Sequence, residues 1–150
     1  MTAATLTADH YARTLDSIAE TIEGLGVDGY RTSSSDRWKR ATRETAPKGG
    51  TGHLDFWVAI GDALDMAKWS RNHITYELQV SFLHRFRART DGKDQAAFQA
   101  AALDVAAALT FWAGPNQGRA TPRRTQISAP DGSWVLVRVG FTLQMQVTYQ

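Results

Sequence analysis

The chain contains no cysteine, so disulfide bonds, thiolate nucleophiles and cysteine-ligated metals are excluded. Uncharged apolar runs are short as well, and none reaches the roughly 18 residues that a membrane-spanning helix needs. The opening residues, MTAATLTADHY, lack the basic and apolar regions of a signal peptide. We therefore expect a protein that is found in the cytoplasm or is assembled there.

Signatures of common active sites are also missing. No Gly-x-Ser-x-Gly turn presents a nucleophilic serine, and KGGTG (48–52) lacks the spacing of a phosphate-binding loop. His53 and Asp55 come nearest to a pair of metal ligands, but no HExxH or other ligand spacing surrounds them. The four histidines fall at the ends of four different predicted elements: His10, His53, His73 and His84. The sequence therefore predicts no catalytic residue, no metal site and no cofactor, and we do not expect an enzyme.

The composition is that of one ordinary globular domain. Hydrophobic residues make up 43% and charged residues 21% of the 150 positions. A domain of this length buries roughly 68–70% of its unfolded surface, which is enough to fold without a metal or a disulfide. We find no internal repeat and no composition change that would mark a second domain, so residues 1–150 are interpreted as a single domain.

The net charge is only +2, but the charges are unevenly distributed. Acidic residues dominate residues 1–28, and basic residues dominate residues 31–48. Such segregation is typical of a chain that meets polyanions, or that packs its acidic region against the basic region of another copy. The alternative is that the two regions are solvated faces of opposite sign.

Two long stretches alternate between apolar and polar residues with the period of a β-strand. They are HITYELQVSFLHRFRART (73–90) and SWVLVRVGFTLQMQVTYQ (133–150). The second stretch would be roughly 50 Å long when extended, whereas a compact domain of this length is about 40 Å across. This strand must therefore bend, for which Gly140 is the natural place, or its hairpin tip must leave the domain and dock on a partner.

Helical spacing occurs in two places. Apolar residues recur every three or four positions over residues 8–24 and again over residues 91–113. Shorter strands are predicted at residues 26–34, 53–60 and 123–128, and the turn APDGS joins the last of these to the C-terminal strand. The predicted fold class is α+β: a mostly antiparallel sheet with two long strands and two helices packed on one face, in the order α-β-β-β-α-β-β.

Residues 33–52 form the least regular part of the chain. This segment is rich in Ser, Thr, Gly and charge, and no period persists along it. We interpret it as a long, mobile loop, a kind of segment that is usually functional or disordered. Trp38 is its one large apolar side chain, which either folds back onto the domain or docks on a partner.

Two groups of basic residues are candidate contacts with DNA or with a neighbouring subunit. Arg85, Arg87 and Arg89 alternate along one strand and project from one face over roughly 13 Å. Such a stripe could follow a nucleic-acid backbone or meet the acidic helix of another subunit. The loop adds a second group, Arg37, Lys39, Arg40 and Arg43.

Three apolar residues are candidate interface anchors: Trp38, Trp134 and Leu136. Trp134 and Leu136 lie at the start of the C-terminal strand, on the face that turns polar from Arg138 onward. Both faces of the strand are therefore apolar near the hairpin tip. Such a tip would be an exposed patch in a monomer and would be buried against a partner.

A nuclease is the alternative from a different class. Asp62 followed by Glu77-Leu78-Gln79 loosely resembles the arrangement of an acid and an acid-x-lysine hairpin that holds Mg²⁺ at a phosphate. Here Gln79 replaces the lysine, and Asp62 lies in a predicted loop. A small nucleic-acid-binding or nuclease domain is therefore the competing prediction.

As an architecture, almost the whole chain resembles the tail terminator family of long-tailed bacteriophages. The resemblance rests on the acidic helix at residues 8–24, the polar loop at residues 33–52 and a strand ending in FWVAI. It continues through ITYELQVSFLHRF into DQAAFQAAALDVAAAL and the closing hairpin, RRTQIS-APDGS-WVLVRVGFTLQMQVTY. This family has no short invariant motif, so no site residue is carried over by position. Other ring-forming neck and tail-tube proteins have similar layouts and are the nearest alternative.

The resemblance implies a structural role rather than catalysis. Tail terminators are ring proteins, described as hexamers, that stop polymerisation of the tail tube and contact the head-proximal connector or stopper protein. DNA passes through the lumen of the ring. For this chain the resemblance implies self-association, contact with a tail tube protein and a connector, non-specific contact with DNA, no cofactor, and a location in the tail or neck of a virion assembled in the host cytoplasm.

Overall fold

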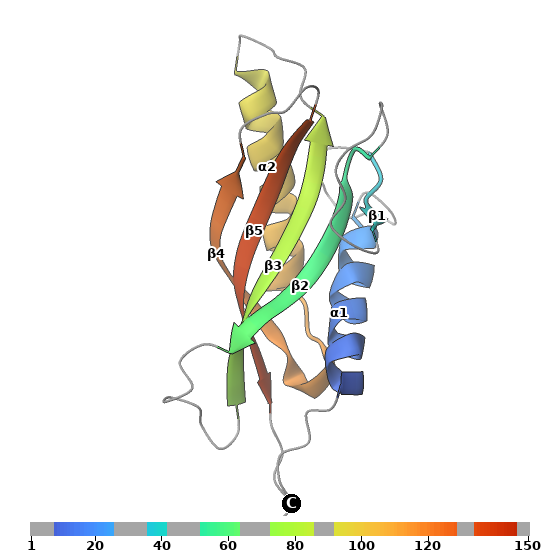
Figure 1. The fold of residues 1–150 in the computed structure, drawn as a ribbon, viewed down its shortest axis with the longest axis vertical. Helices are drawn as coiled ribbons and strands as arrows, with labels where there is room; N and C mark the ends of the chain where they lie inside the picture. The colour runs from blue at the N-terminus through green and yellow to red at the C-terminus, as the bar shows by residue number, and fades with distance from the viewer. Residues whose placement is uncertain are drawn as a thin grey trace, which may run out of the picture.

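The computed structural model of the protein describes residues 8–25, 36–41, 52–63, 73–85, 92–128 and 134–146. Within them, a five-stranded sheet has the order β1-β2-β3-β5-β4, and two helices cover one of its faces (Figure 1). The elements in chain order are α1 (Ala8–Glu23), β1 (Lys39–Arg40), β2 (Asp55–Ala63), β3 (His73–Arg85), α2 (Lys93–Thr110), a short 3-10 helix (Pro115–Gln117), β4 (Arg119–Ile127) and β5 (Trp134–Gln146).

The predicted α+β class is confirmed. Three of the four strand pairs are antiparallel, and the fourth, between β1 and β2, is parallel. The first strand of the described sheet lies at residues 39–40, inside the predicted loop, and the strand expected at residues 26–34 lies outside the described residues. None of the described helices is long and apolar enough to cross a membrane.

The two long strands lie side by side along the long axis of the molecule (Figure 1). β3 and β5 have 13 residues each and pair over their whole length, from His73 opposite Gln146 to Arg85 opposite Trp134. At ~3.3 Å per residue this ribbon is about 43 Å long. The register passes through Gly140 without a shift, so β5 has no bulge against β3 at that residue. The long strand fits because the domain is elongated along it.

The core lies between the sheet and the two helices. One face of each long strand is apolar, and its residues meet the apolar stripes of α1 and α2, as the period-2 and helical spacings require. Fully buried side chains at this interface include Ile18, Ile22, Phe56, Phe82, Val105, Leu109, Phe141 and Leu143. Burial of each such side chain contributes roughly 1.5–3 kcal/mol.

Trp38 belongs to this core. It exposes 6% of its surface, and its ring meets Phe82 and Phe56 edge-on, with centroids 4.8 Å and 6.2 Å away. The next residues form β1, where Lys39 N donates to Leu54 O at 3.2 Å. Of the two sequence-based alternatives for Trp38, folding back onto the domain is therefore confirmed.

Trp112 is buried just after the C-terminal end of α2. Its ring exposes 5% of its surface, and its Nε1 donates a hydrogen bond to Ser17 Oγ of α1 at 3.0 Å. Gly114 and Gly118 pair with each other through an isolated bridge beside the ring. A Cβ at Gly114 would lie 1.9 Å from Trp112 Cζ2, so the indole occupies the space that a side chain at this position would need.

Candidate functional site on the open face of the sheet

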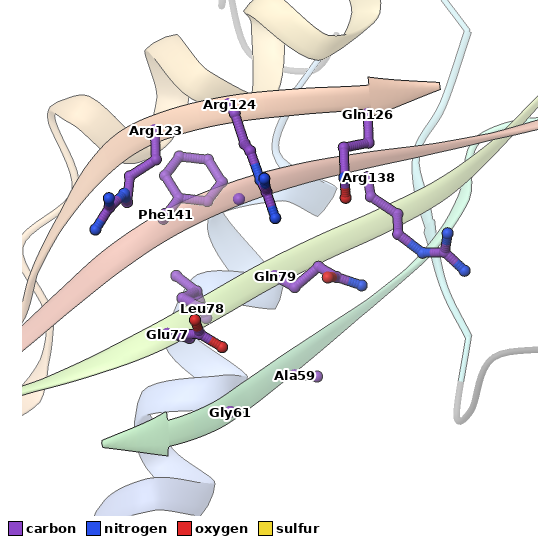
Figure 2. Close-up of a pocket in the computed structure, with 11 residues that line it drawn as sticks. Ala59, Gly61, Glu77, Leu78, Gln79, Arg123, Arg124, Gln126, Arg138 and Phe141 are labelled. Atoms are coloured by element: carbon purple, nitrogen blue, oxygen red, sulfur yellow. The ribbon is translucent and has the colours of Figure 1, made fainter. Parts of the chain in front are cut away.

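The face of the sheet opposite the helices is hollowed into a trough of about 570 Å³, which we call the open-face trough (Figure 2). Side chains of β3, β4 and β5 rise around it, and β2 contributes Ala59 and Gly61 (Figure 2). Its polar lining consists of Glu77 and Gln79 from β3, Arg123, Arg124 and Gln126 from β4, and Arg138 from β5.

Arg123 and Arg124 line the same trough because β4 contains a β-bulge. Successive residues of a regular strand point to opposite faces. Here the register shifts between Pro122 and Arg124, while the partner strand β5 advances by a single residue. A bulge re-aims the side chain of the extra residue, and Arg123 Nη1 donates to Thr142 Oγ1, on the open face, at 3.3 Å.

The floor of the trough is made of small residues, Ala59, Gly61 and Gly140. Gly140 pairs with Arg124 in register, and a Cβ at Gly140 would lie 3.8 Å from Arg124 Cγ. In Figure 2 the Arg124 side chain extends across β5 at this point. A glycine inside a strand often marks a site where a ligand or another chain comes close to the backbone.

The polar lining is rich in hydrogen-bond donors and carries a net positive charge. Three arginines stand against one glutamate, Glu77. Gln79 Nε2 donates to Ser81 Oγ at 3.1 Å, which holds this amide along β3. Guanidinium groups bind the oxygens of phosphates and carboxylates through paired, charge-assisted hydrogen bonds. Chemically, the open-face trough is an anion-binding surface.

A second apolar cluster occupies the end of the open face near the start of β5. Trp57, Leu83 and Trp134 pack together there and expose 7%, 4% and 7% of their surfaces, with Ala41 and Leu136 packed against them. The sequence-based argument for Trp134 as an interface anchor assumed an exposed tip. That assumption is wrong for Trp134, which is buried within its own chain, and a role for Trp134 or Leu136 at an interface stays a prediction.

The predicted arginine stripe reaches the described structure only at Arg85. This residue is exposed and ends β3, and its backbone N–H donates to His53 Nδ1 at 3.1 Å. It is not among the residues that line the open-face trough. Arg87 and Arg89 lie outside the described residues, so the stripe as a whole stays a prediction.

Of the four basic residues predicted as contacts in the loop, the structure describes three. Arg40 binds α1 through Asp16 at 3.0 Å and Glu23 at 2.6 Å. Exposed ion pairs of this kind contribute roughly 0–1 kcal/mol each, so they orient β1 against α1 more than they stabilise it. Arg37 and Lys39 are exposed, and Arg43 lies outside the described residues.

Two of the histidines meet at the junction of β2, β3 and α2. The rings of His53 and His84 are 4.7 Å apart edge-on, and His84 lies 5.0 Å from Phe98 of α2. His53 Nε2 is 3.1 Å from Asp36 Oδ2, and its Nδ1 accepts the Arg85 N–H, so it is the Nε2–H tautomer when neutral. Both ring nitrogens of His53 are therefore engaged, one with Asp36 and one with the end of β3.

Burial lowers the pKa of His84 below its ordinary value of 6.5, and this effect outweighs the hydrogen bond with the Arg85 carbonyl, which raises the pKa. Smaller effects come from His53, which lowers the pKa, and from Asp36 and Asp94, which raise it. The unfolded chain therefore takes up a proton here at a higher pH than the folded one. Stability is complete above pH 6.5 and falls as the pH drops below it. We expect the Tm to fall by a few degrees between pH 7.5 and 5.5, and His84→Asn to reduce that fall.

Thermal unfolding of wild type and His84→Asn at both pH values, followed by circular dichroism, measures the difference. An equal fall in Tm for wild type and His84→Asn would show that His84 is not responsible.

The structure describes the side chains of two of the three residues that suggested a nuclease. Glu77 and Gln79 both line the open-face trough, but the side chain of Asp62 lies outside the described structure. In the part of the chain that the structure describes, no group of three or more His, Asp or Glu side chains is placed to hold a metal ion.

Sequence reasoning missed most of the residues that form the trough. Arg123, Arg124, Gln126 and Arg138 are visible as polar residues in two strands, yet the alternation rule places Arg123 and Arg124 on opposite faces. Two features of the sequence could have placed Arg123 and Arg124 on one face: Pro122 directly before them, and Gly140 in the strand that follows. Proline and glycine within strands often mark bulges.

No protein-family model matches the chain. No curated protein matches it significantly.

Proposed function

We propose that the protein is a structural subunit that resembles phage tail terminators: it forms a ring on the end of a tail tube and joins it to the head-proximal connector, while DNA passes through the lumen. The partners are further copies of the chain, hexameric by family resemblance, a tail tube protein and a connector or stopper protein. Another ring protein of the same neck or tail is the closest variant of this proposal.

The observation that carries the proposal is the difference in charge between the two lateral sides of the sheet. The edge strand β4 carries three exposed arginines: Arg119 at its start, and Arg123 and Arg124, which also line the open-face trough. On the other side, beyond β2, lie the short strand β1 and α1 (Figure 1). Arg40 of β1 is paired with Asp16 and Glu23 of α1, and the further exposed residues of the helix include Asp9 and Glu20. A closed ring of identical subunits needs two different, complementary surfaces on opposite sides of each subunit, and a basic edge facing an acidic helix supplies such a pair.

The edge strand itself argues against ring closure by simple strand addition. β4 contains Pro122, a bulge and several arginines, which are the features that keep edge strands from pairing with another chain. Contact between side chains of β4 and α1 fits these features better than a sheet continued from one subunit to the next.

The test is to image the protein and measure its mass, alone and with purified tail tubes. We expect a ring, or a cap at one end of each tube, and no further tube growth after capping. Glu20→Lys should lower the fraction of capped tubes several-fold because it places a positive charge opposite the basic edge. Its matched control, Arg13→Glu on the same helix, adds negative charge and should not reduce capping.

Two results would contradict the proposal. One is tube growth that continues unchanged with the protein in excess. The other is a monomer that cleaves DNA in the presence of Mg²⁺, which would favour the nuclease alternative. A nucleic-acid-binding domain without ring formation is the second candidate function, and the arginines of the open-face trough are the observation in its favour.

A further inference from the structure

From the open-face trough we infer that the bare face of the sheet is a binding surface for the phosphate backbone of a DNA duplex, read without regard to base sequence. The inference rests on the proposed function for the identity of the polyanion. It assigns the contact to a surface other than the arginine stripe and the basic loop expected from the sequence.

The spacing of the arginines fits a ligand with repeated negative charges. Arg124 lies level with Gly140 on β5, Arg138 lies two residues to one side, and Arg123 reaches Thr142, two residues to the other side. At ~3.3 Å per residue, the three positions are spaced along roughly 13 Å of the sheet. A single small anion would meet one of these positions, whereas a phosphate backbone meets them in succession.

The remaining residues of the trough favour a nucleic acid over an acidic protein. Protein interfaces have an apolar centre with aromatic or aliphatic anchors. The trough instead has a floor of Ala59, Gly61 and Gly140 beneath charged and amide side chains. Protein–DNA interfaces are more polar and more positively charged than protein interfaces, and glutamine side chains are common donors to phosphate oxygens.

The trough also favours a duplex over a single strand. Surfaces that bind single strands stack bases on exposed aromatic rings. The one aromatic residue that lines the trough is Phe141, which exposes 2% of its surface and belongs to the core. Contacts to phosphates position a duplex but carry no sequence information, so binding should be non-specific.

The experiment measures binding of the full chain to fluorescein-labelled 30-base-pair duplexes of two unrelated sequences, by anisotropy across a salt series. Both duplexes should bind with equal affinity, and a 30-base single strand should bind more weakly. Each phosphate contact contributes about 0.9 to the slope of log K against log salt. The double variant Arg123→Gln with Arg124→Gln should therefore reduce the slope by about 1.8 and the affinity by roughly tenfold or more at 0.1 M salt.

Two further variants control for net charge and for the site. Arg13→Gln with Lys93→Gln removes two positive charges from exposed positions on the helices and should leave the slope unchanged. Glu77→Gln removes the one carboxylate of the trough and should raise the affinity several-fold. Arg85→Gln tests the stripe expected from the sequence and should have less effect than the pair in β4.

Several results would overturn the inference: equal affinity and slope for wild type and the β4 double variant, an equal loss in the helix control, or binding of the single strand alone. Loss of ring formation in the β4 double variant with unchanged DNA binding would mean that Arg123 and Arg124 serve the subunit contact alone. Capping of tail tubes by wild type and by Glu20→Lys, which lies outside the trough, separates the two proposals. Capping without DNA contact at the trough contradicts the inference alone, and DNA binding without capping contradicts the proposed function alone.

Discussion

Replacing Trp38 with alanine is expected to lower the free energy of unfolding by about 3–5 kcal/mol, the range for truncating a large buried aromatic side chain. Trp38 exposes 6% of its surface and meets two further core rings, Phe82 and Phe56. Edge-on aromatic pairs contribute about 0.5–1.5 kcal/mol beyond the area they bury. The loss should be measured by urea unfolding followed by far-UV circular dichroism.

The same change should also loosen β1, because Trp38 directly precedes this two-residue strand and its ring packs on Phe56 of β2. Trp38→Phe keeps an aromatic ring in the core and should cost less than the alanine variant. Phe111→Ala is the control for loss of an aromatic residue as such, since Phe111 exposes 87% of its surface and exposed substitutions usually stay within about 0.5 kcal/mol. A loss below 1 kcal/mol for Trp38→Ala would mean that residues 36–41 contribute little to the core.

The parts of the fold that could be predicted are those in which a period persists. The apolar residues of β3 and β5 alternate over many positions, so a shift by one residue would turn every core side chain to the open face. The same holds for α1 and α2, where the helical spacing selects one stripe for burial. These four elements, and their arrangement as helices over one face of a sheet, follow from the sequence alone.

The parts that could not be predicted depend on contacts between segments far apart in the chain. β1 has two residues, too few to show a period, and it exists because Trp38 reaches the core and Lys39 N bonds to Leu54 O. The bulge in β4 is likewise a property of its pairing with β5. The sequence of one strand does not show whether the paired segment of its partner has the same number of residues, so it does not show a bulge.

This difference explains why the sequence did not indicate the open-face trough. The stripe at Arg85, Arg87 and Arg89 stays a prediction from strict alternation within one strand. The trough takes its arginines from β4 and β5, and two of them, Arg123 and Arg124, share a face only because alternation breaks there. Alternation is therefore a sound guide to the core and a weaker one to a site at which a bulge re-aims side chains.

Gly114 is a position where a single methyl group should have a large effect. A Cβ at this residue would lie 1.9 Å from Trp112 Cζ2. Two carbon atoms that are not bonded to each other cannot approach so closely, so Gly114→Ala must displace the indole or the backbone. The indole is buried and donates a hydrogen bond to Ser17 of α1, so it has little freedom to move. We expect the free energy of unfolding to fall by about 1–3 kcal/mol, the usual cost of overpacking, as measured by urea unfolding.

The cause of this loss can be isolated by a double-mutant cycle with Trp112→Phe. A phenyl ring is smaller than the indole, so Gly114→Ala should cost less in the Trp112→Phe background than in the wild type, and the two changes should be coupled by about 0.5–3 kcal/mol, as expected for residues in contact. Gly140→Ala is the control, because a Cβ there would lie 3.6 Å from Arg124 O, an ordinary contact, and the variant should stay near wild-type stability. Equal costs of Gly114→Ala in both backgrounds would mean that the glycine is needed for its backbone and not for the space that Trp112 fills.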